Sequence, residues 1–182
     1  MVVKIGGSLL AQPDCLDAVL AVIARAARAS RLLVVPGGGP FADTVRRVDD
    51  QLHLSDDAAH WMAVLAMDQY AHLIAERLEC GALVTGIREV TAAVDAGRVP
   101  VLAPSRWLRD VDPLPHSWDV TSDSIAAWVA GAVGAQRLVL VKPAGAAGSE
   151  IVDPYFSRAL SAGVEPRVVA AGQLDELLSV TP

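Results

Sequence analysis

The sequence predicts an α/β fold, a three-layer αβα sandwich in which helices cover both faces of a mainly parallel sheet. Short runs rich in Val and Leu alternate along the chain with longer amphipathic stretches. Runs that are apolar at every position are typical of strands buried on both faces, and helical crossovers between such strands make them parallel. The length of 182 residues and the hydrophobic content of 53% suit one domain that spans residues 1–182.

Six short apolar runs are predicted as the strands of this sheet. They are Val2–Ile5, Leu32–Val35, Ala82–Thr85, Val99–Ala103, Leu138–Val141 and Arg167–Ala170. The stretches between them are predicted as helices, because their apolar residues recur on one face. These helices are Asp14–Ala29, Phe41–Asp50, Asp56–Leu78, Ile87–Ala96, Ser122–Val133, Pro154–Ala162 and Leu174–Leu178. Ser55 is the expected N-cap of the longest helix, whose first turn carries acidic residues that favour the helix dipole.

Two stretches lack a regular pattern and are predicted as irregular segments. Pro104–Ser117 is rich in Pro, Trp and charged residues, and we expect it to form a lid or an acceptor-binding loop. Pro143–Ser149 is rich in Gly and Ala. Neither stretch has the low-complexity composition of a linker between domains, so the prediction of one domain stands.

The charge pattern excludes several classes of partner. The formal net charge is −6 and the longest basic run is Arg46-Arg47, so we expect neither nucleic acid nor an anionic membrane surface as a partner. The chain has neither an uninterrupted apolar stretch of about 18 residues nor the regions of a signal peptide. Cys15 and Cys80 lie far apart and are interpreted as reduced thiols. We therefore expect a cytoplasmic location.

The histidines do not have the spacing of a metal site, so no metal-binding residue is predicted. They are His53, His60, His72 and His116. His60 lies on the longest predicted helix with Trp61, Met62 and Met67. Two interpretations of this group stay open. Packing in the core or between helices is the more usual role of such residues, and the alternative is that they form one wall of an acceptor pocket.

The two lysines of the chain are the first candidates for chemistry. Only Lys4 and Lys142 among the 15 basic residues are lysine, and each lies where a predicted strand ends. Parallel sheets bind their ligands at the carboxyl ends of the strands. A lysine ammonium is a compact point charge that suits phosphate. The positions therefore predict two phosphate-binding lysines, and the alternative stays open that both are only solvated side chains.

Glycine-rich loops follow the first two predicted strands. Gly6, Gly7 and Ser8 follow the first strand, and Gly37, Gly38 and Gly39 follow the second. Glycines let backbone N–H groups approach an anion closely, and a helix N-terminus adds a favourable dipole. Either loop alone could be an ordinary turn. Two such loops at neighbouring strand ends predict a phosphate site.

Two carboxylates lie near the start of the helix predicted at Ser122–Val133. Asp119 and Asp123 would face one pocket if the turn before the helix is tight. A carboxylate there could hold the lysines in place or coordinate Mg²⁺. The alternative stays open that Asp123 only favours the helix dipole and that Asp119 caps a turn.

Taken in order, these motifs resemble the amino acid kinase family. The matching residues are the Lys4–Ser8 opening, the Val34–Gly39 loop, the helix start Asp123–Ala127 and the segment from Leu138 to Gly145. The resemblance implies an ATP- and Mg²⁺-dependent kinase whose Lys4 neutralises the transferred phosphoryl group. It also implies that Gly6, Gly7, Gly37, Gly38 and Gly39 hold the phosphates and the acceptor, that Asp123 orients Lys4, and that Asp119 lines the acceptor side.

Within the family, two segments resemble short kinases of methanofuran biosynthesis. The segments are Trp118–Ser124 and His60–Gln69. The resemblance implies [5-(aminomethyl)furan-3-yl]methyl phosphate as the acceptor. The family's later lysine is missing and the C-terminus is shortened, so Lys142 is expected to take that lysine's place. A homo-oligomer is expected. Two alternatives remain: a non-catalytic ligand-binding or regulatory relative, and a kinase for another carboxylate or phosphate acceptor.

Overall fold

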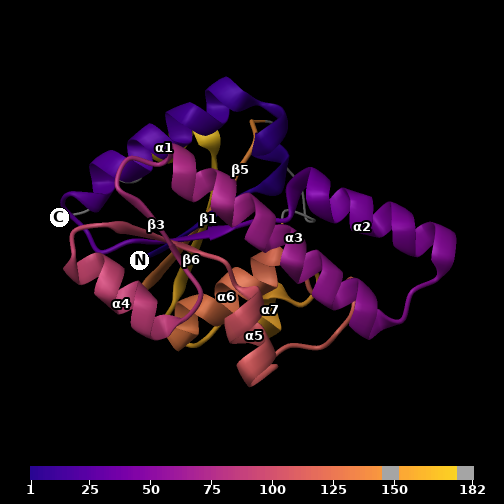
Figure 1. Ribbon diagram of the computed structural model, residues 1–182. Coiled ribbons are helices and arrows are strands. Elements are labelled where there is room, and N and C mark those ends of the chain that lie inside the picture. Colours follow the sequence, from indigo (N-terminus) through magenta and orange to yellow (C-terminus); the bar gives the residue numbers. More distant parts are fainter. Residues whose placement is uncertain (145–151, 176–182) are drawn as a thin grey trace.

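The computed structural model describes residues 1–144 and 152–175, and in them a parallel six-stranded sheet carries helices on both faces (Figure 1). The strands lie in the order β3-β4-β2-β1-β5-β6. Their bounds are β1 Val2–Ile5, β2 Leu33–Pro36, β3 Gly81–Val84, β4 Val99–Leu102, β5 Arg137–Lys142 and β6 Glu165–Ala170. Strands β1, β2 and β4 are buried at every residue, as expected for strands covered on both faces.

The first strand lies in the middle of the sheet because the chain extends the sheet on both sides of it. Val2 of β1 pairs with Leu33 of β2 on one side and with Leu138 of β5 on the other. Both pairings are parallel, so the carboxyl ends of all three strands meet at one edge. The three motifs that follow these strands in the sequence are therefore neighbours in space.

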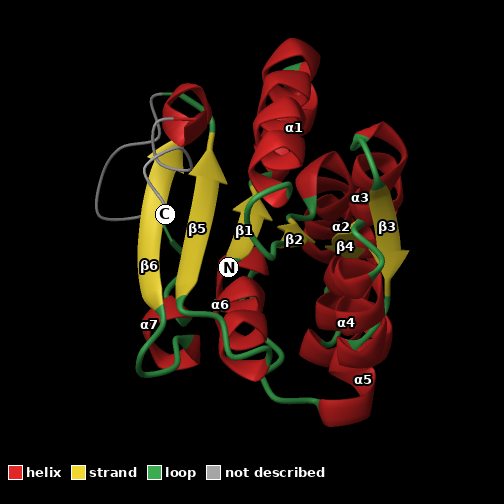
Figure 2. Cartoon of the chain, turned by 90° about the vertical axis from the view of Figure 1, so that its left-hand side faces the viewer, coloured by secondary structure: helices red, strands yellow, loops and turns green. Residues whose placement is uncertain are grey.

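The helices form two layers, which Figure 2 shows on either side of the sheet. The bounds are α1 Pro13–Ala27, α2 Gly39–Leu52, α3 Asp56–Arg77, α4 Ile87–Asp95, α5 Ser105–Val111, α6 Ser122–Ala132 and α7 Phe156–Ala159, with short 3₁₀ helices at Gly7–Ala11 and Ala171–Gln173. Helix α1 packs on the face of the sheet that carries Val3 and Ile5, and α4 and α6 pack on the face that carries Val2. The fold class predicted from the sequence is confirmed.

Helix α3 contributes to both layers. Val64 and Met67, in its first half, pack in the core beneath α6, whereas Tyr70 and Ile74, in its second half, pack in the core beneath α1. Its first half runs antiparallel to α2, and the two helices project from the sheet together (Figure 1). The Ser55 side chain accepts a hydrogen bond from the Ala58 amide at 3.3 Å, which confirms the predicted N-cap.

The predicted elements differ most from the observed ones in two places. Pro104–Ser117 was predicted as irregular but contains α5, whose first amide and Ser105 hydroxyl both donate to Asp68 of α3. That carboxylate satisfies a helix N-terminus from 37 residues away, which no local pattern reveals. The helix predicted at Pro154–Ala162 is only the short α7. Of the helix predicted at Leu174–Leu178, Leu174 and Asp175 are described and are helical, and its other residues lie outside the described residues, as does most of the loop Pro143–Ser149.

Among the described helices, none is both long enough and apolar enough to cross a membrane.

Candidate functional site

The two lysines point to the same face of the sheet because side chains alternate along a strand. Lys4 follows Val2 by two residues, and Lys142 follows Leu140 by two residues, so each shares a face with its predecessor. Val2 and Leu140 both belong to the core beneath α6. Lys4 also pairs in register with Leu140 on the neighbouring strand. The two ammonium groups therefore reach the start of α6 from adjacent strands.

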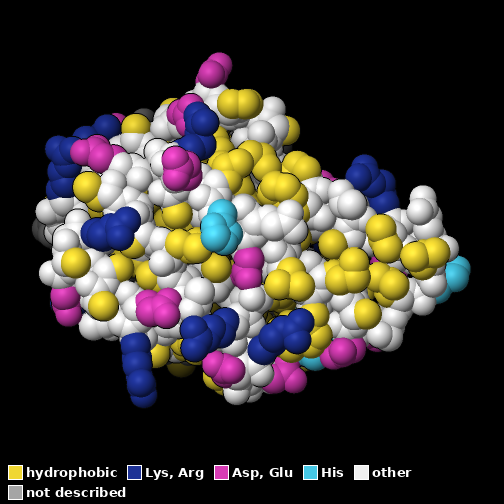
Figure 3. All heavy atoms as spheres, viewed as in Figure 1, with side chains coloured by type: hydrophobic (Ala, Val, Ile, Leu, Met, Phe, Trp, Pro, Cys, Tyr) yellow, Lys and Arg dark blue, Asp and Glu magenta, His cyan; other side chains and the backbone are white. Residues whose placement is uncertain are grey.

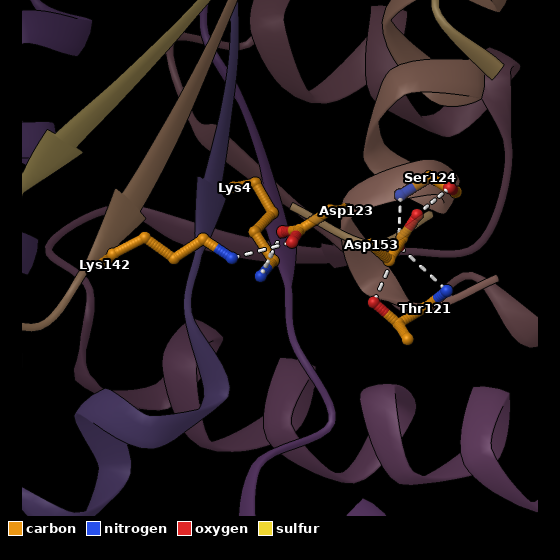
Figure 4. A network of polar contacts seen from close by, with 6 residues as sticks. All are labelled: Lys4, Thr121, Asp123, Ser124, Lys142 and Asp153. Atoms are coloured by element: carbon orange, nitrogen blue, oxygen red, sulfur yellow. Dashed lines mark hydrogen bonds and ion pairs between the residues drawn. The ribbon is translucent and has the colours of Figure 1, made fainter. Parts of the chain in front are cut away.

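Asp123, in the first turn of α6, contacts both lysines (Figure 4). Lys4 Nζ lies 2.7 Å from Asp123 Oδ1, and Lys142 Nζ lies 2.7 Å from Asp123 Oδ2. The side chains of Lys4 and Asp123 are almost fully buried, and that of Lys142 is 16% exposed. The three groups form a Lys-Asp-Lys bridge, in which two positive charges share one negative charge.

The bridge changes the protonation of its members. Burial lowers the pKa of Lys4 below its usual value, and the Asp123 carboxylate opposes that change. Burial alone would raise the pKa of Asp123, but the charges of Lys4 and Lys142 hold this pKa below its usual value. Asp123 is thus ionised at neutral pH. The excess positive charge of the bridge suits an anionic ligand such as a phosphate.

Asp153 fixes the start of α6, and the sequence analysis missed it. Its Oδ2 accepts hydrogen bonds from the Thr121 amide at 2.9 Å, the Thr121 hydroxyl at 2.7 Å and the Ser124 amide at 3.0 Å. The Ser124 hydroxyl donates to its Oδ1. These bonds satisfy helix N-terminal amides around Asp123. Asp153 is 29 residues from Ser124 along the chain, so only the tertiary structure reveals the contact.

The two glycine loops pack directly against each other. A side chain on Gly7 would place its Cβ 2.1 Å from the Gly39 nitrogen, and one on Gly37 would place its Cβ 2.6 Å from the Gly7 nitrogen. Gly39 also has a φ of 55°, in the left-handed region. Glycine is required at these positions because two backbones meet there.

The loop glycines divide into two groups by what their amides do. The Gly6 amide donates to the Val141 carbonyl at 2.9 Å, and the Gly37 amide donates to the Ile5 carbonyl at 2.8 Å. These two amides extend the sheet and are engaged in backbone hydrogen bonds, and the phosphate-holding role of Gly6 and Gly37 stays a prediction. Gly7, Gly38 and Gly39 line a cavity instead, and Gly39 begins α2 where helix amides lack intrahelical partners.

The cavity has a volume of about 220 Å³ and extends from the glycine loops between α2, α3 and the segment that leads into α6. Its lining comprises Gly7, Ser8, Gly38 and Gly39 of the loops, Ala42, Asp43 and Arg46 of α2, Asp56, Ala59, His60, Ala63, Val64 and Met67 of α3, and Ser117, Trp118, Val120, Thr121, Ser122 and Ile125. The wall is apolar around α3, and its charged groups lie on the two helices. An anionic group thus fits at the loops and a second polar group fits between the helices.

Trp118 is held in the cavity wall from two sides. Its Nε1 donates to Asp49 Oδ2 of α2 at 2.7 Å, and the Arg46 guanidinium lies 4.2 Å from the centre of its ring. Asp49 also accepts a hydrogen bond from the Leu54 amide at 2.9 Å. The segment before α6 is thereby tied to the turn between α2 and α3.

The structure does not bring Asp119 into the cavity. Its neighbours Trp118 and Val120 line the cavity, whereas Asp119 is exposed and lies outside the lining. The reason is a tight turn, in which the Val120 amide donates to the Ser117 carbonyl and alternate residues face opposite ways. Carboxylates that do line the cavity are Asp43 and Asp56. His60 and Met67 line it too, so the pocket-wall interpretation of that helix holds for them, while Met62 is exposed.

The part of the chain that the structure describes contains no group of three His, Cys, Asp or Glu side chains that could hold a metal ion. Both oxygens of Asp123 contact lysines. In kinase sites Mg²⁺ is usually held by one or two carboxylates together with the phosphates of the substrate. Asp43 in the cavity wall is a carboxylate of that kind.

The sequence is similar to those of known proteins. A sequence profile of the amino acid kinase family matches residues 1–144. The [5-(aminomethyl)furan-3-yl]methyl phosphate kinase of Methanocaldococcus jannaschii is 30% identical over 139 residues, which are 76% of this chain and 63% of that protein. The chain thus spans less than two thirds of the length of this relative.

Solved structures share the fold. The uridylate kinase of Archaeoglobus fulgidus superposes with a TM-score of 0.72 at 15% identity, covering 98% of this chain and 95% of that one. The UMP kinase of Bacillus anthracis superposes with a TM-score of 0.61 at 14% identity, covering 86% of this chain and 69% of that one.

The contact between the glycine loops predicts that Gly7→Ala destabilises the protein. The added Cβ would overlap the Gly39 backbone, and overpacking of this kind costs about 1–3 kcal/mol. Gly86→Ala is the matched control, because Gly86 has an extended φ of −172° and nothing within 4 Å of an added Cβ. Urea unfolding of the two variants measures the difference. Equal stabilities would show that the loops can separate without cost.

Proposed function

Because the chain belongs to the amino acid kinase family, we propose that it transfers a phosphoryl group from ATP to a small phosphate monoester. The observation that carries the proposal is the buried bridge of Lys4, Asp123 and Lys142, because its carboxylate stands on the helix α6 that also contributes Ser122 and Ile125 to the wall of the cavity lined by the glycine loops. Phosphoryl transfer requires positioning and charge neutralisation more than a protein nucleophile. Two lysines, a carboxylate that orients them and backbone amides supply these requirements.

In this reaction Lys4 and Lys142 would act as point charges on the phosphoryl group. Charge spreads over the equatorial oxygens of that group in the transition state, and preorganised cations stabilise it there. Asp123 holds both ammonium groups at 2.7 Å and so prevents them from turning away. Lys142 thereby takes the place of the later lysine that the family resemblance implies.

ATP, with Mg²⁺ bound to its phosphates, supplies the phosphoryl group. The amides of Gly7 and Gly39 and the ammonium groups of the bridge suit its phosphates, because side chains are excluded between the loops and positive charge is in excess. Most of the loop that follows β5, Gly145 included, lies outside the described residues.

For the acceptor we propose [5-(aminomethyl)furan-3-yl]methyl phosphate, the compound in the printed name of the Methanocaldococcus jannaschii relative. Its phosphate would lie at the glycine loops near Lys4. Its ring would lie along the apolar wall that includes Val64 and Trp118. Its ammonium would lie between α2 and α3, where Asp56 in the first turn of α3 is the carboxylate farthest along the hairpin from the loops.

We also propose that the protein forms a homo-oligomer through the outer surface of α2 and α3. Leu52, Met62 and Leu65 are exposed on these two helices. Figure 3 shows hydrophobic side chains gathered over this part of the molecule. Burial of such side chains between two copies would be favourable.

Replacement of Lys4 should abolish turnover. Lys4→Met keeps the apolar stem but removes the ammonium, and the loss of one preorganised charge lowers kcat by about 10²–10³. Arg98→Met, at an exposed site before β4, is the control and should retain full activity. The measurement is steady-state kinetics with ATP and the aminomethyl acceptor. A Lys4→Met enzyme with more than about a tenth of the wild-type rate would contradict the role of Lys4. ATP binding by the wild type without turnover would favour a regulatory relative.

Lys142→Arg should lower kcat although the positive charge is kept. A planar guanidinium cannot occupy the place of a compact ammonium 2.7 Å from Asp123 without moving that carboxylate and Lys4. We expect a loss of about tenfold or more, and the midpoint of thermal unfolding, measured alongside, shows whether the variant is folded. Normal kinetics for Lys142→Arg would show that Lys142 takes no part in phosphoryl transfer.

Asp56→Asn should weaken the binding of the acceptor and leave the binding of the nucleotide unchanged. A hydrogen bond to a charged group contributes roughly 1.5–3 kcal/mol, so KM for the aminomethyl acceptor should rise about 10–150-fold while KM for ATP changes little. Asp119→Asn is the matched control, because Asp119 is an exposed carboxylate outside the cavity. If Asp119→Asn raised this KM and Asp56→Asn did not, the segment before α6 would have to turn inward when the acceptor binds.

A further inference from the structure

His60 is a buried polar side chain that the phosphoryl-transfer chemistry does not use. Among the described residues the buried polar or charged side chains are Lys4, His60, Asp123 and Ser124. Lys4 and Asp123 belong to the bridge, and Ser124 contacts Asp153. His60 lies on α3, is 8% exposed and lines the cavity.

The ring of His60 has no hydrogen-bond partner among the residues that the structure describes. Its contacts with them are with other rings. It stacks on His116 with the ring centres 4.2 Å apart and an angle of 15° between the planes, and it meets Trp61 edge-on at 5.0 Å. The ring nitrogens keep access to solvent, because they are not among the enclosed polar atoms that lack a partner. An accessible ring nitrogen at the wall of a cavity can form its hydrogen bond with a ligand bound there.

The neighbours of His60 keep its ring in one orientation. His116 Nδ1 lies 2.9 Å from Asp57 Oδ1, and His116 Nε2 lies 2.9 Å from Asp112 Oδ1. These contacts fix the plane on which His60 stacks. The Arg109 guanidinium covers Trp61 at 4.6 Å from the ring centre. A ring held in this way can bond a ligand in the cavity without further loss of conformational entropy.

The ring is also uncharged at neutral pH. Burial, together with the charge of His116, lowers the pKa of His60 to about 4, while Asp57 and Asp112 act in the opposite direction. A neutral imidazole has one nitrogen that donates a hydrogen bond and one that accepts. The accepting nitrogen can receive an N–H group, and an uncharged ring does not repel a cation.

Asp56 stands one helical turn before His60 and lines the same cavity. Residues four apart on a helix lie on the same face. A carboxylate and a hydrogen-bond acceptor side by side suit a primary ammonium, which carries a positive charge and three N–H donors.

We infer that His60 is a specificity residue that accepts a hydrogen bond from a primary ammonium group of the acceptor, next to the carboxylate of Asp56. This inference rests on the proposed function for the identity of the acceptor. It deepens that function because it names the side chain that distinguishes amine-bearing acceptors from other acceptors. Loss of the ring nitrogens should weaken the binding of acceptors that carry the amine and leave the binding of other acceptors unchanged.

The test is direct binding, so that it does not depend on turnover. Isothermal titration measures the Kd of the aminomethylfuran phosphate and of the analogue that has a methyl group in place of the aminomethyl group. His60→Phe keeps an aromatic ring that can stack on His116 but removes both nitrogens. His72→Phe is the matched control, because His72 is exposed on the same helix. His60→Leu replaces His60→Phe if that variant does not unfold cooperatively.

We expect the wild type and His72→Phe to bind the amine compound more tightly than the methyl analogue. In His60→Phe the Kd of the amine compound should rise about 10–150-fold, and the Kd of the methyl analogue should stay within twofold. The inference is overturned if His60→Phe weakens the binding of both compounds equally or of neither. It is also overturned if the wild type binds the two compounds with the same Kd. Selective binding without phosphorylation would reject the proposed kinase activity and keep the role of His60.

Discussion

One carboxylate that neutralises two lysines is the interaction on which the site depends. Asp123 lies 2.7 Å from the ammonium groups of both Lys4 and Lys142, and Lys4 is buried almost completely. Removal of one partner from a buried ion pair typically costs about 3–5 kcal/mol. The fold therefore needs β1 beside β5 and the start of α6 over both of them. Asp153 meets the last requirement by binding the amides of Thr121 and Ser124.

The rest of the site follows from how close two backbones can come. Because Gly7 and Gly39 touch without side chains between them, the loops after β1 and β2 close one end of the cavity with backbone atoms. The hairpin of α2 and α3 closes the other end with side chains, among them Asp56 and His60. The two ends differ in chemistry for that reason. Backbone amides and lysines suit phosphates of any kind, whereas the side chains of the hairpin can select the acceptor.

The elements of the sheet were predictable because local sequence determines them. Each of the six predicted strands is present within two residues of its expected bounds, since short runs rich in Val and Leu favour strands. The burial predicted for them is wrong for β6, which is exposed at four of its six residues because it lies at the edge of the sheet. The segment around α5 was not predictable, because a carboxylate on α3 satisfies its first amide. Asp119 shows the same limit on a smaller scale. Its place in the sequence suggests a pocket residue, and a single tight turn points it to solvent.

The sequence by itself determined the family, the parallel sheet and the two lysines at strand ends, because periodicity and short motifs act over a few residues. The tertiary structure decided which of these residues meet. Asp123 contacts Lys4 across 119 residues of chain, and Asp153 caps the helix that carries Asp123. It also decided that Gly6 and Gly37 complete the sheet while Gly7 and Gly39 face the cavity. Contacts between distant segments depend on how layers pack, and local patterns do not encode that packing.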